Sequence, residues 1–190
     1  MRLSNSSSSF FKKTAVILST VLWTSILLSA ESGMRVVPKP WKTEIGQGVF
    51  GLSRKTIITI PSEFLLETAR QCSLGISRRI GLAIPIRMIP AGKIPKNTVA
   101  LSLDPADSAL GTEGYRLSVT PSGIAVRAAD EAGAFYGIQT LFQLVPLGTG
   151  NQVKSFPVPC VRIEDRPRFS WRGLHLDVSR HFFPIPFIKT

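Results

Sequence analysis

The sequence predicts an α+β fold, in which an open sheet is covered by two helices. Short apolar segments rich in β-branched residues, two stretches with apolar residues three and four positions apart, and turn residues between them support this prediction. With 190 residues, 44% hydrophobic and 18% charged, the chain can bury a core, and whole-chain disorder is excluded. The length is below the roughly 200 residues that a complete (β/α)₈ barrel needs.

Residues 1–30 have the layout of a secretory signal peptide. Basic residues precede an uncharged stretch from 15 to 30, where Ser29 and Ala30 offer a cleavage point. The stretch is shorter than the roughly 20 residues of a membrane-spanning helix, and an uncleaved signal anchor is the alternative. We therefore expect export to the periplasm, the medium or, in a eukaryote, a lysosome-like compartment, with no stable membrane partner after cleavage.

The charge and the cysteines limit the partners that we expect. The formal net charge is +11, but the basic residues are scattered and are not interleaved with aromatic residues, so no nucleic-acid partner is expected. Two cysteines and two histidines leave few ligands for a metal site. Cys72 and Cys160 could pair in an oxidising compartment, although Cys72 fits a buried thiol on a helix.

The first strand is predicted over Thr56–Ile60, which is β-branched and followed by Pro61. Ser62 is expected to cap a helix that ends at Gly81. Residues 35–51 contain prolines and glycines and are predicted to be an extended lead-in followed by turns. The helix should bury a stripe that consists of Leu65, Ala69, Cys72, Ile76 and Ile80.

Four further strand segments follow this helix. Leu82–Ile89 contains Pro85 and is predicted to be an edge strand. Thr98–Leu103 is a second strand, and Tyr115–Val119 with Ile124–Ala128 forms a predicted hairpin.

A second helix is expected to begin after an Asp130 cap and to end at Pro146. Phe156–Pro159 is then interpreted as a connector. The buried face of the helix is predicted to contain Phe135, Ile138, Leu141 or Phe142, and Val145.

The last segment, Trp171–Val178, is predicted to be a buried strand, and the approach to a helix follows Pro184. A buried strand without a partner indicates that the chain ends inside a second domain. We therefore expect the isolated chain to be poorly soluble, and truncation after Pro146 to improve its yield. Polar residues gather here, and they fit either a structural ion pair between Asp177 and Arg180 or a functional strand end.

This segment resembles a known family. From 166 to 184 it runs Arg-Pro-Arg-Phe-Ser-Trp-Arg-Gly-Leu-His-Leu-Asp-Val-Ser-Arg-His-Phe-Phe-Pro, similar to the opening of the catalytic barrel of family 20 glycoside hydrolases, the β-N-acetylhexosaminidases. Asp130–Leu144 is similar to the last helix of that family's N-terminal accessory domain. The resemblance covers roughly Met34 to Thr190.

The resemblance implies a non-catalytic α+β domain at 34–150 and the truncated start of a (β/α)₈ barrel, with its first strand, at 160–190. Members of the family remove terminal non-reducing N-acetylglucosamine or N-acetylgalactosamine from glycans. The substrate's acetamido oxygen attacks the anomeric carbon, a Glu acts as acid and base, and the adjacent Asp orients the acetamido group. No metal or organic cofactor is implied, and N-acetylhexosamine-containing glycans are the expected partners.

Arg172 matches the family's sugar-binding arginine, which hydrogen-bonds the C3 and C4 hydroxyls of the substrate. Asp177, Arg180 and His181 also match the motif and are expected to support the strand end. His175 lies in the same segment and is interpreted as a surface residue.

The family's catalytic Asp-Glu pair has no counterpart in this chain, which should be inactive alone. Asp130-Glu131 is expected at a helix start, where a cap and a first-turn acid are favourable, and Glu164-Asp165 precedes the barrel. The pair is expected beyond about residue 300 of a longer protein.

Two alternatives remain open at this stage. One is another acetamido-sugar hydrolase with the same type of accessory domain and two neighbouring Asp residues. The other is a non-catalytic glycan-binding or domain-packing module. Retention of the chain on N-acetylglucosamine resin, reversed by free sugar, would distinguish the module, and we expect no retention.

Overall fold

A computed structural model describes residues 36–90, 92, 95–148 and 154–189. The predicted signal peptide therefore lies outside the described residues. The architecture is a seven-stranded mixed sheet in the order β1-β7-β5-β6-β4-β2-β3. Its strands are β1 (Lys42–Leu52), β2 (Ile57–Ile60), β3 (Ile86–Met88), β4 (Thr98–Leu103), β5 (Tyr115–Thr120), β6 (Gly123–Ala128) and β7 (Phe156–Asp165).

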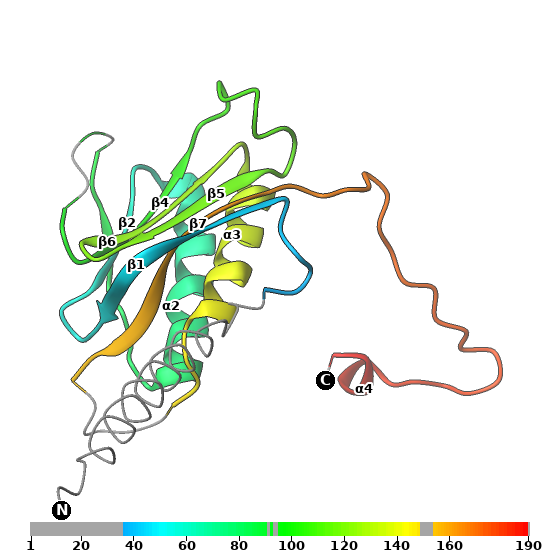
Figure 1. The fold of residues 1–190 in the computed structure, drawn as a ribbon. Helices are drawn as coiled ribbons and strands as arrows, with labels where there is room; N and C mark the ends of the chain where they lie inside the picture. Colours follow the sequence, from blue (N-terminus) through cyan, green and yellow to red (C-terminus); the bar gives the residue numbers. More distant parts are fainter. Residues whose placement is uncertain (1–35, 91, 93–94, 149–153, 190) are drawn as a thin grey trace, which may run out of the picture. The chain divides into compact units, whose positions relative to one another are not determined.

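Two helices, α2 (Leu66–Ile80) and α3 (Glu131–Leu144), cover one face of this sheet (Figure 1). The predicted α+β fold is confirmed. Strands β2, β4 and β6 pair in parallel with their neighbours β3, β2 and β4, whereas β5, β7 and β1 pair antiparallel. The opposite face of the sheet carries no helix within the described residues.

Helix α2 follows a single 3-10 turn, η1 (Glu63–Leu65), and packs as its periodicity predicts. All five residues of the predicted stripe are at most 2% exposed. Gly81 ends the helix in the left-handed conformation, with φ of 71°, which favours glycine. Ser62 occupies the N-cap position, but its side chain makes no capping hydrogen bond, so that part of the prediction is wrong.

Helix α3 begins at its predicted cap, since the Asp130 carboxylate accepts a hydrogen bond of 2.8 Å from the Gly133 backbone N–H. The prediction that Phe135 is buried is wrong, because this side chain is 36% exposed. Glycines face the sheet instead. A Cβ added at Gly133 would lie 2.4 Å from the Gly114 carbonyl oxygen, and one at Gly137 would lie 2.5 Å from a Val126 methyl group. The helix backbone therefore approaches the sheet too closely for a large side chain.

Strand β1 occupies residues that were expected to form turns. It pairs antiparallel with β7, and the register shifts between Ile45 and Val49. Gly48 lies in this irregularity with φ of 87°, and a Cβ added at Gly46 would lie 3.1 Å from the Cys160 Cβ. The glycines that suggested a turn are thus explained by a bulge within a long strand.

The connector predicted at Phe156–Pro159 is instead the first half of β7, which lies between β1 and β5. Proline is tolerated there because β7 pairs with β5 only from Val161 onward. Among the described strands, Pro157 and Pro159 pair with β1 alone, so the N–H that each lacks is not needed by a second strand.

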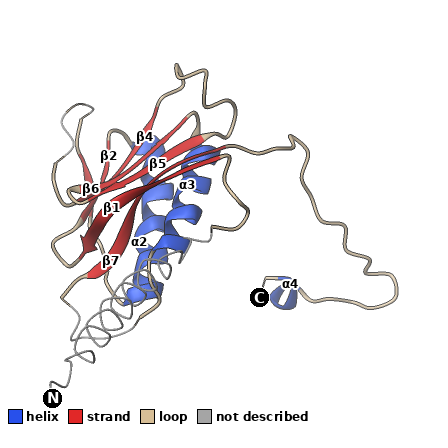
Figure 2. Ribbon diagram, in the orientation of Figure 1, coloured by secondary structure: helices blue, strands red, loops and turns tan. Residues whose placement is uncertain are grey.

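The barrel strand predicted at Trp171–Val178 is absent from the described structure. Residues 166–184 contain no helix or strand (Figure 2), and Trp171 and Leu174 are each 90% exposed. A β-strand needs a neighbour for its backbone hydrogen bonds, and no strand of the sheet pairs with this segment. A four-residue helix, α4 (Ile185–Ile188), follows Pro184, as the sequence suggested.

Both cysteines are free and buried, so the disulfide left open by the sequence is not formed. Burial raises the pKa of the Cys72 thiol to about 12. In the described part of the chain, no helix has the length and apolar character needed to cross a membrane.

Candidate functional site

Arg172, the predicted sugar-binding residue, is held by the α+β domain. Its Nη1 donates a 2.6 Å hydrogen bond to the Phe169 carbonyl. Its Nη2 donates to the Glu113 carboxylate and, at 3.1 Å, to the Tyr136 hydroxyl. The guanidinium also lies 5.7 Å from the centre of the Tyr136 ring. The carboxylate of Glu113 raises the pKa of Arg172, which therefore remains charged.

A pocket of about 550 Å³ extends from Arg172 between α3 and the segments at 37–39 and 165–172. One wall contains a buried polar group, in which the Tyr115 hydroxyl lies 2.5 Å from Thr140 Oγ1 and 3.5 Å from Asp165 Oδ2. Burial is the main reason that the pKa of Tyr115 rises to about 12. The phenol therefore stays protonated at neutral pH and acts as a structural hydrogen-bonding group.

The other predicted site residues form a separate local cluster. The Asp177 carboxylate accepts hydrogen bonds from the Ser179 backbone N–H at 2.9 Å and from its hydroxyl at 2.5 Å. These bonds lower the pKa of Asp177. Arg180 Nε lies 3.8 Å from the same carboxylate, and the His181 ring packs edge to face against Phe183. Among the described residues, no hydrogen bond or ion pair joins this cluster to Arg172.

Both adjacent acidic pairs have structural roles. Asp130 caps α3 and also accepts a 2.8 Å hydrogen bond from the Glu113 backbone N–H. Glu164 accepts from Arg116 Nε at 2.8 Å, and Asp165 accepts from the Trp41 backbone N–H at 3.0 Å. Asp165 lines the pocket but is held by the Trp41 backbone N–H, and Asp130 and Glu164 are held by their own partners, so neither pair is arranged as an acid and a base.

The arrangement fixes the Arg172 guanidinium through Glu113, Tyr136 and Phe169, and the described residues place no acid–base pair beside it. The described residues also contain no group of three or more His, Cys, Asp or Glu side chains that could hold a metal ion. Sequence reasoning missed Glu113 and Tyr136. Nothing marks Glu113 locally, and Tyr136 would have been found only by recognising that the glycines of α3 turn its aromatic residues away from the sheet.

Comparison with known proteins gives a consistent result. Residues 33–166 match the family model described as glycosyl hydrolase family 20, domain 2. A beta-hexosaminidase of Porphyromonas gingivalis is 34% identical over 84% of this chain and 20% of its own length. A beta-N-acetylhexosaminidase of Cellulomonas fimi is 34% identical over 82% of this chain and 30% of its own length. The chain thus spans a fifth to about a third of these curated relatives.

Solved structures resemble the same region. The N-acetyl-beta-hexosaminidase of Streptomyces plicatus, solved in complex with thio-NAglucal, superposes with a TM-score of 0.67 and 31% identity over 80% of this chain and 30% of its own. A mutant of the same enzyme, in complex with its product GlcNAc, superposes with a TM-score of 0.64 and 30% identity over 78% of this chain and 29% of its own.

Proposed function

The chain belongs to glycosyl hydrolase family 20 through its match to domain 2 of that family, and from this premise we propose that it is the N-terminal portion of an exported β-N-acetylhexosaminidase. The whole enzyme would remove terminal non-reducing N-acetylglucosamine or N-acetylgalactosamine from glycans by substrate-assisted, retaining catalysis. The match over residues 33–166 carries this proposal, and the names of the relatives support it.

In this proposal, residues 36–165 form the accessory domain and contribute no catalytic group. Asp130 is engaged in a cap, Glu164 in an ion pair and Asp165 in a backbone contact. We therefore expect no hydrolysis by this chain alone. The acid–base Glu and its Asp neighbour would be supplied by further sequence of the whole protein.

Arg172 would bind the C3 and C4 hydroxyls of the sugar, because its planar donors suit a vicinal diol. In the present structure those donors are taken by Glu113, Tyr136 and Phe169. Sugar binding therefore requires Arg172 to leave these partners, which supports the expectation that this chain alone does not retain N-acetylglucosamine.

The test is expression of the full-length gene product and assay on p-nitrophenyl N-acetyl-β-glucosaminide. We expect hydrolysis with retention of configuration, and a loss of about a hundredfold or more in kcat/KM for Arg172→Ala. Arg70→Ala, on the exposed side of α2, is the matched control and should keep its activity. An inactive full-length protein, or equal losses in both variants, would contradict the proposal.

A further inference from the structure

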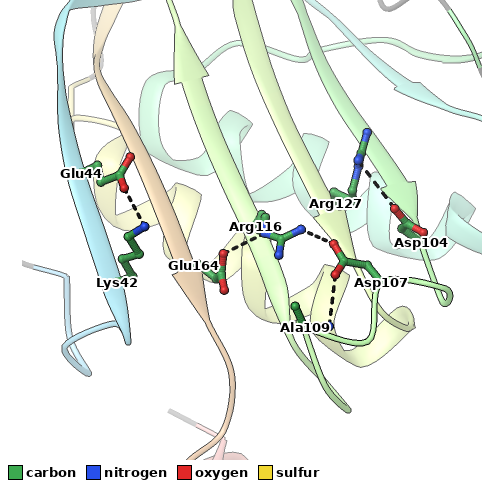
Figure 3. Close-up of polar contacts among 8 residues, drawn as sticks. All are labelled: Lys42, Glu44, Asp104, Asp107, Ala109, Arg116, Arg127 and Glu164. Atoms are coloured by element: carbon green, nitrogen blue, oxygen red, sulfur yellow. Dashed lines mark hydrogen bonds and ion pairs between the residues drawn. The ribbon is translucent and has the colours of Figure 1, made fainter.

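The sheet face opposite α2 and α3 is strongly charged. Figure 3 shows side chains of β1, β7, β5 and β6 projecting from this face, and they include Lys42, Glu164, Arg116 and Arg127. These four residues are cross-strand neighbours in one row, because Lys42 pairs with Glu164, Glu164 with Arg116, and Arg116 with Arg127. In the adjacent row, Arg162 on β7 is the cross-strand neighbour of Ser118 on β5.

A hollow of about 420 Å³ lies on this face. Its floor contains Ser118 and Ala125, which are cross-strand neighbours with short side chains. Arg162 lies beside Ser118, and Arg116 and Arg127 lie two residues further along β5 and β6. Strands are about 4.8 Å apart and alternate residues on one strand about 7 Å apart, so three arginines surround the small floor.

The three arginines differ in how closely the carboxylates of this face approach their guanidinium groups. Arg116 is fixed by hydrogen bonds to both Glu164 and Asp107. Arg127 lies 3.6 Å from Asp104, which is beyond a good hydrogen bond, and its side chain is 56% exposed. Arg162 is exposed and makes no ion pair within 4.0 Å among the described residues.

The acidic cross-strand neighbour of Arg162 has another partner. Glu44 is its cross-strand neighbour on β1, and the Glu44 carboxylate lies 2.8 Å from the Lys42 ammonium. This hydrogen bond is the main reason that the pKa of Glu44 is lowered. The charge of Arg162 also contributes to the lowered pKa of Glu44, but no hydrogen bond joins these two side chains among the described residues. The guanidinium groups of Arg127 and Arg162 lack a close hydrogen bond to a carboxylate and are therefore the available donors of the hollow.

We infer that this hollow binds a sulfate or carboxylate group carried on a glycan chain, held by Arg127 and Arg162 above Ser118. Planar guanidinium groups match the oxygens of such anions, and the Ser118 hydroxyl offers a further donor from the floor. The inference rests on the proposed function for the choice of a glycan as the carrier. It adds that the glycan is anionic and that it contacts the accessory domain.

The lining also argues against other ligands. Among the residues that the structure describes, no aromatic side chain lines the hollow. Neutral sugars and single-stranded nucleic acids are commonly held by stacking on aromatic rings, which this face does not provide.

Calorimetric titration of the full chain with a chondroitin sulfate oligosaccharide tests the inference. Arg127→Gln/Arg162→Gln should weaken binding about tenfold or more, because two charge-assisted contacts are lost. Arg70→Gln/Arg78→Gln is the matched control, since it removes the same charge from exposed positions on α2 and should weaken binding less than about threefold. Equal losses in the two double variants would show non-specific attraction and overturn the inference.

A third variant distinguishes a loss of binding from a loss of the folded state. Ser118 makes no side-chain hydrogen bond among the described residues, so Ser118→Asp adds a negative charge to the floor without removing a contact. It should abolish binding while thermal unfolding remains cooperative. Retained binding in this folded variant would contradict the inference.

Three further titrations identify the ligand. A neutral chitooligosaccharide should not bind, and free sulfate should compete only at much higher concentration than the glycan. Equal affinity for the neutral sugar, for free sulfate or for a single-stranded oligonucleotide would overturn the glycan assignment. Hydrolysis of an uncharged N-acetylglucosaminide by the full-length gene product tests the proposed function separately, because this substrate carries no anionic group for the hollow.

Discussion

Strand β7 should be indispensable to the α+β domain, and two truncations test this directly. One chain ends after Pro146 and lacks β7, whereas the other ends after Arg168 and keeps it. From the sequence alone, the shorter chain was expected to be the better-behaved product. The position of β7 between β1 and β5 reverses that expectation.

The magnitude follows from the side chains that β7 buries. Phe156, Val158, Val161 and Ile163 are between 0% and 5% exposed. Burial of each stabilises the fold by about 1.5–3 kcal/mol, which gives roughly 6–12 kcal/mol as an upper estimate. This is about the entire stability of an ordinary domain, roughly 5–15 kcal/mol. Loss of β7 also removes all strand pairing of β1.

The segment after Arg168 contributes little by comparison. Most large apolar side chains between Phe169 and Ile188 are 41–90% exposed, Phe183 being half-buried, and Arg172 makes its contacts at the surface. The chain that ends after Arg168 keeps the stacking of the Arg166 guanidinium on Trp41 at 4.9 Å. We therefore expect its unfolding to resemble that of the longer chain, with better solubility.

Circular dichroism and urea titration provide the assay. The chain that ends after Arg168 should unfold in one cooperative transition, and the chain that ends after Pro146 should show no cooperative transition at 25 °C. If the shorter chain unfolded cooperatively at a similar urea midpoint, the contribution assigned to β7 would be refuted.

Three smaller perturbations test other features. Gly133→Ala should lower the free energy of unfolding by about 1–3 kcal/mol, since the new methyl group meets a backbone carbonyl, whereas Gly173→Ala, with nothing near it, should have little effect in the same urea titration. Asp130→Ala should cost about 1–2 kcal/mol in that assay through loss of the α3 cap, and an unchanged midpoint would argue against the cap. The raised pKa of Cys72, about 12 against an ordinary 9.0, means that the unfolded chain loses its proton first, so stability should fall as pH rises from about 9 towards 12. Urea midpoints at pH 7, 9 and 10 should show a flatter decline for Cys72→Ala, and parallel declines would contradict this.

The sequence predicted elements well where the local pattern and the packing agreed. The α2 stripe, the Gly81 stop and the Asp130 cap each depend on spacing and backbone conformation, which are local properties. β4 was found with its bounds because it combines β-branched and apolar residues and ends at Asp104-Pro105.

The predictions were wrong at residues whose conformation depends on a neighbour that is distant in the sequence. Pro157 and Pro159 are compatible with a strand only because one side of β7 lacks a partner there. Gly48 belongs to a bulge that exists only through pairing with β7. Phe135 turns outward because Gly133 and Gly137 bring the helix backbone against the sheet. The hydrogen bond from Arg172 to Glu113, 59 positions earlier, likewise cannot be predicted from the local sequence pattern.

The pairing of β1 with β7 also determines when this domain can be completed during synthesis. The backbone N–H of Trp41 donates a hydrogen bond to the Asp165 carboxylate, 124 positions later, and β1 has no other strand beside it in the described part of the chain. β1 is synthesised early but therefore cannot pair until almost the whole domain has been synthesised. The domain therefore remains unfinished, with the edges of β1 and β5 unpaired on the side of β7, until β7 has been synthesised.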